Sequence, residues 1–299
     1  MLNEKWFGLE NAEKEFLEST SLYEEEQKRQ QLNRVVEEFA QDLENIYSDM
    51  LEYSFSNEDA EELIEMYRKL QGIIERNHLD RSPLLLFSDL LLLQNRLEEA
   101  KVLNEHLLEY YREEGNPIFY ATACNRLSSV FVKMDNFPKA EKWAKESLRV
   151  FRKLSTKFSD SFETSVANAC FGLGQLYLEM GIVEKFDMAE SLLKEALEVY
   201  KKIKQQDYKL YSEAIAEIYD CLAVKYGNEG KYEEAEVMFK VILEIYKELN
   251  EESPGMYTSN LLSNCYNLTK LNEEKCGNFD LKDLNEKALQ LYKKLGVKE

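Results

Sequence analysis

Apolar residues recur along the chain three or four positions apart, which is the spacing of amphipathic helices. The stretch 216–249 is representative, with an apolar helical run, a turn marked by Gly230 and a second apolar run. Neither helix could bury its apolar stripe alone, so each must pack against a neighbour. The chain has only 4 Pro and 11 Gly in 299 residues, too few for the turns of an all-β protein. The pattern therefore predicts an all-α protein built from long helices.

The apolar pattern also repeats at longer range. An aliphatic residue, two spacers, an aromatic residue and then usually a basic residue occur in six copies, 40 to 49 residues apart. The copies begin at Ile64, Leu108, Leu148, Leu197, Leu243 and Leu289. Upstream of most copies, a small residue is followed by an Ala in the next helix, as for Ala223 and Ala235 or Gly174 and Ala189. Small side chains let two helix backbones approach closely, so the pattern predicts stacked helix pairs.

These signals divide the chain into six predicted helix pairs preceded by a further helical segment. The pairs are expected at 30–77, 83–113, 117–156, 159–205, 207–251 and 255–296. No long Gly/Ser linker separates them. We therefore expect an N-terminal helical extension over 1–29 and one helical repeat domain over 30–299.

Composition narrows the choice of partners. The formal net charge is −19, which disfavours nucleic acid and anionic membrane and leaves a neutral or basic protein or peptide. An excess of Glu that only keeps a helical surface soluble explains the charge as well. The most hydrophobic stretch, 84–93, is shorter than the ~20 residues that a transmembrane helix requires. The five cysteines are odd in number and widely spaced, without a C-x-x-C pair, so disulfides are not expected and a cytoplasmic location is predicted.

The strongest motifs lie in the fourth and fifth pairs. Leu222, Ala223 and Tyr226 are followed by Ala235 and Phe239. This resembles the L-G-x2-Y and A-x3-F pattern of the tetratricopeptide repeat (TPR). The family period is about 34 residues, and the longer period here resembles kinesin light chain repeats and the peptide-pheromone receptors of Gram-positive bacteria. The resemblance implies a right-handed superhelical solenoid of about six antiparallel helix pairs, with the first helix of each pair lining a concave groove.

No constellation typical of catalysis occurs in the sequence. The two histidines, His78 and His106, have no metal-ligand spacing around them, and neither H-E-x-x-H nor G-x-S-x-G is present. The G-L-G at 172–174 lies within a helical run, where close helix packing explains it better than a phosphate loop. We therefore predict no enzymatic activity, no catalytic or metal site and no cofactor.

Polar positions on the first helices define the predicted peptide-binding site. An amide side chain can donate to a peptide carbonyl and accept from a peptide N–H at once. The expected residues are Asn125, Ser129, Asn168, Phe171, Gln175, Glu217, Asp220, Asn264 and Asn267. Glu217 and Asp220 would attract a Lys or Arg of the ligand, with an affinity that falls as salt rises. The alternative for each residue is that it merely faces water.

The leading hypothesis is a protein that recognises an extended peptide or partner segment in its concave groove. Two alternatives stay open. One is a peptide-responsive regulator resembling the Gram-positive pheromone receptors. The other is a structural assembly scaffold whose convex or terminal faces build an assembly. A homo-oligomer is compatible with both, and dimerisation through terminal helices would support the regulator.

Overall fold

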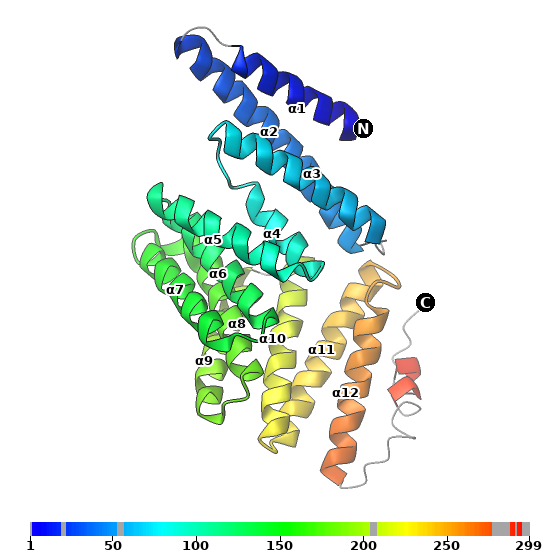
Figure 1. The fold of residues 1–299 in the computed structure, drawn as a ribbon. Helices are drawn as coiled ribbons and strands as arrows, with labels where there is room; N and C mark the ends of the chain where they lie inside the picture. The colour runs from blue at the N-terminus through cyan, green and yellow to red at the C-terminus, as the bar shows by residue number, and fades with distance from the viewer. Residues whose placement is uncertain are drawn as a thin grey trace. The chain divides into compact units, whose positions relative to one another are not determined.

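The computed structural model describes residues 2–18, 22–52, 57–203, 208–276, 288–290 and 292–294. Every regular element within these ranges is helical, which confirms the predicted all-α class (Figure 1). The chain divides into two compact units, Met1–Asn136 and Phe137–Glu299, each with its own packed helices.

The described part of the first unit is a run of six α-helices, each packed against the next in the chain. They are α1 (Leu2–Leu17), α2 (Leu22–Glu52), α3 (Asn57–Arg76), α4 (Leu84–Leu93), α5 (Leu97–Glu113) and α6 (Pro117–Lys133). The expected start of the first pair at residue 30 lies inside α2, which begins at Leu22. The apolar stripe of α2 is continuous across that point, since Leu32, Val36 and Phe39 are all buried.

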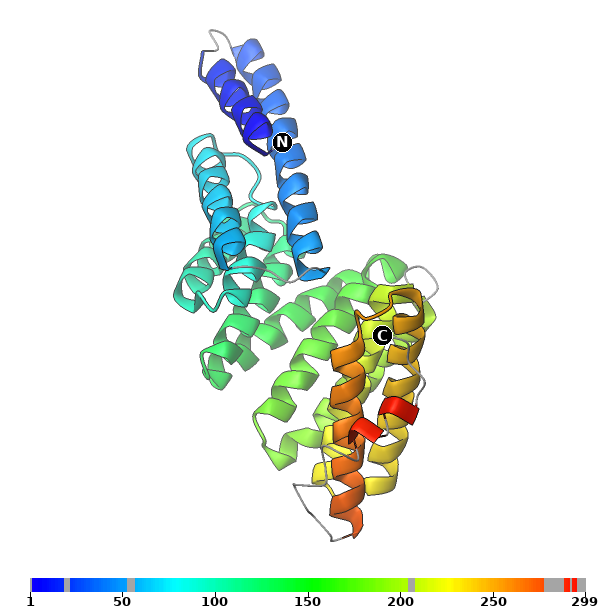
Figure 2. The same cartoon turned by 90° about the vertical axis from the view of Figure 1, so that its right-hand side faces the viewer.

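The second unit contains the remaining helices, again packed in chain order (Figure 2). They are α7 (Phe137–Ser155), α8 (Glu163–Glu179), α9 (Phe186–Ile203), α10 (Tyr208–Asn228), α11 (Tyr232–Glu252) and α12 (Thr258–Cys276), with short 3-10 turns η1 (Ser159–Phe162) and η2 (Val183–Lys185). The predicted pairs 159–205 and 207–251 are α8 with α9 and α10 with α11. The helices of the predicted pair 117–156, α6 and α7, belong to different units. Most of the expected last helix lies outside the described residues.

Close helix contacts form where the small residues predicted them. A Cβ added to Gly174 of α8 would lie 2.9 Å from Cγ of Leu193 and 3.3 Å from the carbonyl oxygen of Ala189 on α9. Ala189, Ala223 and Ala235 are each fully buried. The G-L-G at 172–174 is therefore a helix-packing motif, as expected. The turn between α10 and α11 depends on Gly230, whose φ of 73° favours a residue without a Cβ.

Candidate peptide-binding pocket

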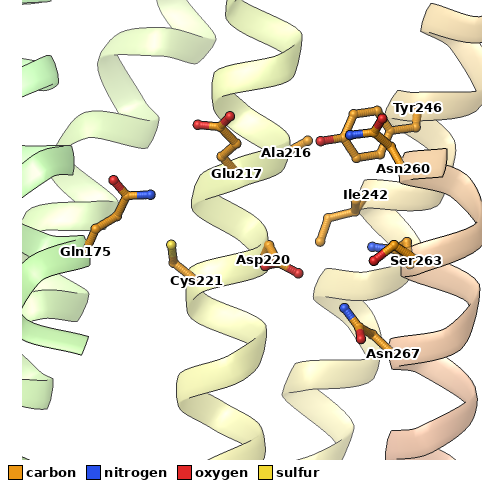
Figure 3. Close-up of a pocket in the computed structure, with 11 residues that line it drawn as sticks. Gln175, Ala216, Glu217, Asp220, Cys221, Ile242, Tyr246, Asn260, Ser263 and Asn267 are labelled. Atoms are coloured by element: carbon orange, nitrogen blue, oxygen red, sulfur yellow. The ribbon is translucent and has the colours of Figure 1, made fainter. Parts of the chain in front are cut away.

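A pocket of about 240 Å³ lies within the second unit, between the first helices of successive pairs (Figure 3). Its walls come from α8, α10 and α12, with α11 contributing from behind. The lining residues are Gln175, Ala216, Glu217, Asp220, Cys221, Ile242, Tyr246, Asn260, Ser263, Asn264 and Asn267. The pocket therefore lies on the helices that the sequence pattern assigned to the groove.

The acidic wall belongs to α10. Glu217 and Asp220 are one helical turn apart, a spacing that puts both on one side of the helix. The neighbouring residues Ile218 and Leu222 turn away from the pocket and are buried in the core. Helical periodicity thus separates the apolar stripe that holds α10 in place from the polar side chains that line the pocket.

The pKa values of both carboxyl groups are raised above the ordinary values for Glu and Asp. Glu217 is exposed and Asp220 is half-buried. Partial desolvation by the surrounding protein raises the pKa of Glu217, and the nearby carboxylates of Glu213 and Asp220 raise it further. Burial alone raises the pKa of Asp220. Among the described residues, neither carboxylate has a Lys, Arg or His within ion-pairing distance. When these carboxyl groups ionise, no cation of the described residues neutralises their charge, so ionisation is disfavoured.

The facing wall is a polar stripe on α12. Asn260, Ser263, Asn264 and Asn267 follow the helical spacing and all line the pocket. Asn264 is only 4% exposed, yet its Oδ1 has no hydrogen-bond partner among the described residues. A buried acceptor without a donor is costly and calls for an explanation. Because Asn264 lines the pocket, this acceptor is a candidate partner for a hydrogen-bond donor bound there.

Two further contacts close the pocket. Gln175 extends from α8 toward Cys221 (Figure 3). Burial raises the pKa of the Cys221 thiol to about 12, against a lowering hydrogen bond from the Gln175 side chain, which favours the protonated thiol. Burial also raises the pKa of Tyr246, against a lowering hydrogen bond from Asn260.

The pocket brings together five of the nine residues that the sequence predicted. They are Gln175, Glu217, Asp220, Asn264 and Asn267. The other four lie elsewhere. Asn168 is exposed on α8 and accepts a hydrogen bond from the Tyr200 hydroxyl at 2.5 Å. Phe171, also on α8, is half-buried and does not line the pocket.

Asn125 and Ser129 are on α6 and so belong to the other compact unit. The Ser129 hydroxyl donates to the Asn125 carbonyl oxygen at 3.4 Å within that helix. Sequence reasoning missed Asn260 and Ser263. The polar stripe that they form with Asn264 and Asn267 repeats at helical spacing and could have identified them.

At the C-terminal end of α10, by contrast, charged side chains form ion pairs. The Lys225 side chain is completely buried and forms ion pairs with Glu190 of α9 and, at 2.9 Å, with Glu229. The Tyr226 hydroxyl donates to Glu190 at 2.8 Å, and Lys194 contacts the same carboxylate at 2.6 Å. Burial works against ionisation, but these partners outweigh it and lower the pKa of Glu190 to about 2. This group of residues is called the Lys225 cluster below.

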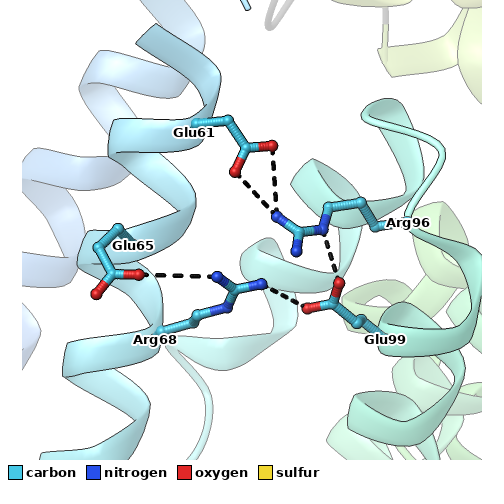
Figure 4. A network of polar contacts seen from close by, with 5 residues as sticks. All are labelled: Glu61, Glu65, Arg68, Arg96 and Glu99. Atoms are coloured by element: carbon cyan, nitrogen blue, oxygen red, sulfur yellow. Dashed lines mark hydrogen bonds and ion pairs between the residues drawn. The ribbon is translucent and has the colours of Figure 1, made fainter. Parts of the chain in front are cut away.

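Charge is also compensated in the first unit. Arg68 and Arg96 both contact Glu99, at 2.8 and 2.7 Å, and Arg96 reaches Glu61 at 3.1 Å (Figure 4). Arg68 also approaches Glu65 at 3.7 Å. These side chains link α3 to α5 at a hollow of about 410 Å³. Each acid of this network has a cation beside it, unlike the acids of the α10 pocket.

Within the described part of the chain, no group of three or more His, Cys, Asp or Glu side chains could hold a metal ion. His78 and His106 are both exposed. In the ranges that the structure covers, we find no helix with the length and apolar character needed to cross a bilayer.

Comparisons with known proteins agree with this architecture. Residues 215–254, which form most of α10 and α11, match the family described as Tetratricopeptide repeat. No curated protein sequence matches the chain. Among solved structures, BtubC (BKLC) from P. vanneervenii has a TM-score of 0.55 and 18% identity, with 90% of this chain and 91% of that chain covered.

A second group of similar structures is described as nearly identical TPR-like repeats of a putative kinesin light chain from Podosopora anserina. One structure and a counterpart with a single substitution each give a TM-score of 0.52 and 14% identity, covering 71% of this chain and 92% of that chain. At this level of identity the likeness concerns the fold. It confirms the predicted TPR-like, all-helical repeat architecture.

Proposed function

From the premise that this chain is a TPR-like repeat protein, we propose that it binds a basic segment of a partner protein in the pocket between α8, α10 and α12. Proteins of this architecture use extended surfaces of stacked repeats for protein–protein interaction. The fold alone does not select a ligand, because unrelated functions share it. The proposal therefore depends on the chemistry of the pocket.

The uncompensated charge of Glu217 and Asp220 carries the proposal. In the Lys225 cluster of the same unit, by contrast, Glu190 and Glu229 are both paired with Lys225. In the pocket, burial raises the pKa values of both acids, which means that their ionised forms are disfavoured without a partner. A Lys or Arg side chain of a ligand would remove that cost. Sites with such perturbed groups in a concavity are candidates for function.

The amide side chains support an extended ligand rather than a single ion. Gln175, Asn264 and Asn267 come from two different helices and can each donate to or accept from a peptide backbone. The pocket of about 240 Å³ is smaller than the 300–1,000 Å³ typical of drug-sized ligands. A ligand that inserts one side chain and lays its backbone across the opening fits this size best.

The direct test is retention of short peptides on the immobilised protein. Degenerate peptide pools with a fixed basic centre should be retained by the wild type and lost from the variant Glu217→Gln/Asp220→Asn. The matched control is Glu244→Gln/Glu251→Gln, which removes the same charge from exposed positions of α11. Retention should weaken between low and high salt, because partly exposed ion pairs are screened. Equal retention by both double variants would contradict the proposal.

The two alternative hypotheses predict different outcomes for these proteins. An assembly scaffold would change its molar mass in light scattering when outward-facing apolar residues such as Val237, which is 55% exposed, are replaced by Ser. A peptide-responsive regulator would retain peptides in the pocket and change its mass on binding. Peptide retention tests whether the partner segment is basic, and light scattering tests for a homo-oligomer. The cytoplasmic location stays a prediction.

A further inference from the structure

We infer that the pocket between α8, α10 and α12 is an arginine subsite, which accepts a guanidinium group in preference to an ammonium group. This inference rests on the proposed function and makes its ligand more specific. The polar atoms of the pocket that lack a partner determine which kind of ligand can bind. The groups without a protein partner are acceptors: the Asp220 and Glu217 carboxylates, which have no ion pair, and the buried Oδ1 of Asn264, which has no hydrogen bond.

These acceptors come from facing helices. Figure 3 shows Asp220 extending from α10 toward α12, while Asn267 extends from α12 toward α10. Asn264 lines the same pocket from α12. A group that satisfies both walls must donate hydrogen bonds in two directions at once. A guanidinium does this with a rigid planar fork, whereas an ammonium presents fewer donors around a point.

The remaining walls suit the rest of an arginine side chain. Ala216 and Ile242 provide apolar contact for its methylene stem. The Tyr246 ring also lines the pocket and offers an aromatic surface for the cation. A guanidinium is more weakly hydrated than an ammonium, so it is easier to bring into a partly buried site. No Lys or Arg among the lining residues competes for the acids.

The test uses four degenerate pools of short peptides that differ only at the fixed centre: arginine, lysine, citrulline or glutamine. Citrulline keeps the shape of arginine and lacks its charge. The arginine pool should be retained about tenfold more than the lysine pool, and the citrulline and glutamine pools should not be retained. Because this comparison varies only the peptide, it does not depend on how any protein variant folds.

Protein variants then locate the preference. Asn264→Leu replaces the unsatisfied amide with an apolar group of similar size, and should reduce arginine retention to the lysine level. Glu217→Gln/Asp220→Asn should abolish retention of both basic pools, and Glu244→Gln should change neither. Thermal unfolding of each variant checks that it is folded.

The outcomes separate the two proposals. Equal retention of arginine and lysine, both lost with Glu217→Gln/Asp220→Asn, overturns the arginine preference and leaves the basic-segment proposal standing. An arginine preference that survives both Asn264→Leu and the double variant overturns the inference, because it arises elsewhere on the chain. Retention of neither basic pool above citrulline overturns both proposals.

Discussion

The middle and the C-terminal end of α10 treat charge in opposite ways. In the middle, Glu217 and Asp220 have raised pKa values. Among the described residues, no Lys, Arg or His lies within ion-pairing distance of either carboxylate. Two turns later, Lys225 is fully buried between Glu190 and Glu229, and the pKa of Glu190 falls to about 2. Both stretches lie on one helix in the same compact unit. Their difference therefore reflects the residues opposite them rather than the helix itself.

The contrast separates a structural use of charge from one that suits binding. At the Lys225 cluster, ions of both signs come from α9 and α10 and join the two helices. In the pocket, α12 faces the acids with amides and a hydroxyl, which leave their charge in place. Departures from local compensation in an otherwise consistent fold are expected at functional sites. The following experiments test this contrast, beginning with the largest expected effect.

Replacing the buried cation should be the most damaging change. Lys225→Met leaves Glu190 and Glu229 without the buried partner between them, and we expect a loss of about 3 kcal/mol in the free energy of unfolding. The matched control is Lys240→Met, which removes an exposed cation 2.6 Å from Glu236 and should cost no more than ~0.5 kcal/mol. Urea unfolding measures both. Similar losses in the two variants would show that the Lys225 cluster is no more than a surface ion pair.

The two stretches of α10 should respond to pH with opposite signs. The pKa of Glu190 is lowered from 4.5 to about 2, so its stabilisation is present above about pH 4.5 and is lost as the pH falls toward 2. Glu190→Gln should cost about 2 kcal/mol near neutral pH, and this difference should shrink in acid. The raised pKa values of Glu217 and Asp220 reverse the sign, because their ionised forms destabilise the fold above those pKa values.

The variant Glu217→Gln/Asp220→Asn should therefore be slightly more stable than wild type near neutral pH, by no more than ~0.5 kcal/mol, because Glu217 is exposed and solvent screens its charge. That gain should disappear as the wild-type acids become protonated. Urea unfolding at several pH values between neutral and acid measures both trends. A double variant that is less stable than wild type at neutral pH would mean that the two acids are satisfied by the protein itself.

Closing the gap at Gly174 tests the packing that holds the pocket's α8 wall. The new Cβ of Gly174→Ala would meet Leu193 at 2.9 Å. Overpacking costs about 1–3 kcal/mol, and the better helix propensity of Ala returns about 1 kcal/mol. We expect a net loss of about 1 kcal/mol in thermal unfolding, together with weaker retention of basic peptides. Gln175→Ala, the next residue, should change stability by less than ~0.5 kcal/mol; a larger loss there than at Gly174 would contradict the packing account.

The smallest effect is expected in the arginine–glutamate network of the first unit. Glu99→Gln removes the acid between Arg68 and Arg96, whose ion pairs are partly exposed. Such pairs contribute at most ~1 kcal/mol and are screened by salt. The loss in stability should therefore be below ~1 kcal/mol and should vanish at high salt. A salt-independent loss would mean that this network stabilises the fold as the buried Lys225 cluster does, and not as a set of surface ion pairs.

Much of this fold could be predicted because its signals are local. The breakers, the apolar period and the small residues identified most helices and the close approach at Gly174 and Ala189. The start of α2 was harder to predict, since its apolar stripe continues from Leu32 with no breaker near residue 30. The position of Asn168 was harder still to predict. Its spacing matches the groove, but its amide oxygen accepts a hydrogen bond from the Tyr200 hydroxyl of the next helix.

The sequence by itself determined that this chain is a stack of helix pairs, because helical periodicity and small-residue spacing depend on neighbours within one or two turns. It also determined that Glu217 and Asp220 share one side of α10. Only the tertiary structure decided which polar residues meet and which acids acquire a cation. That decision depends on residues far apart in the chain, such as Glu190 with Lys225 or Asp220 with Asn264, and no local pattern specifies how their helices are placed.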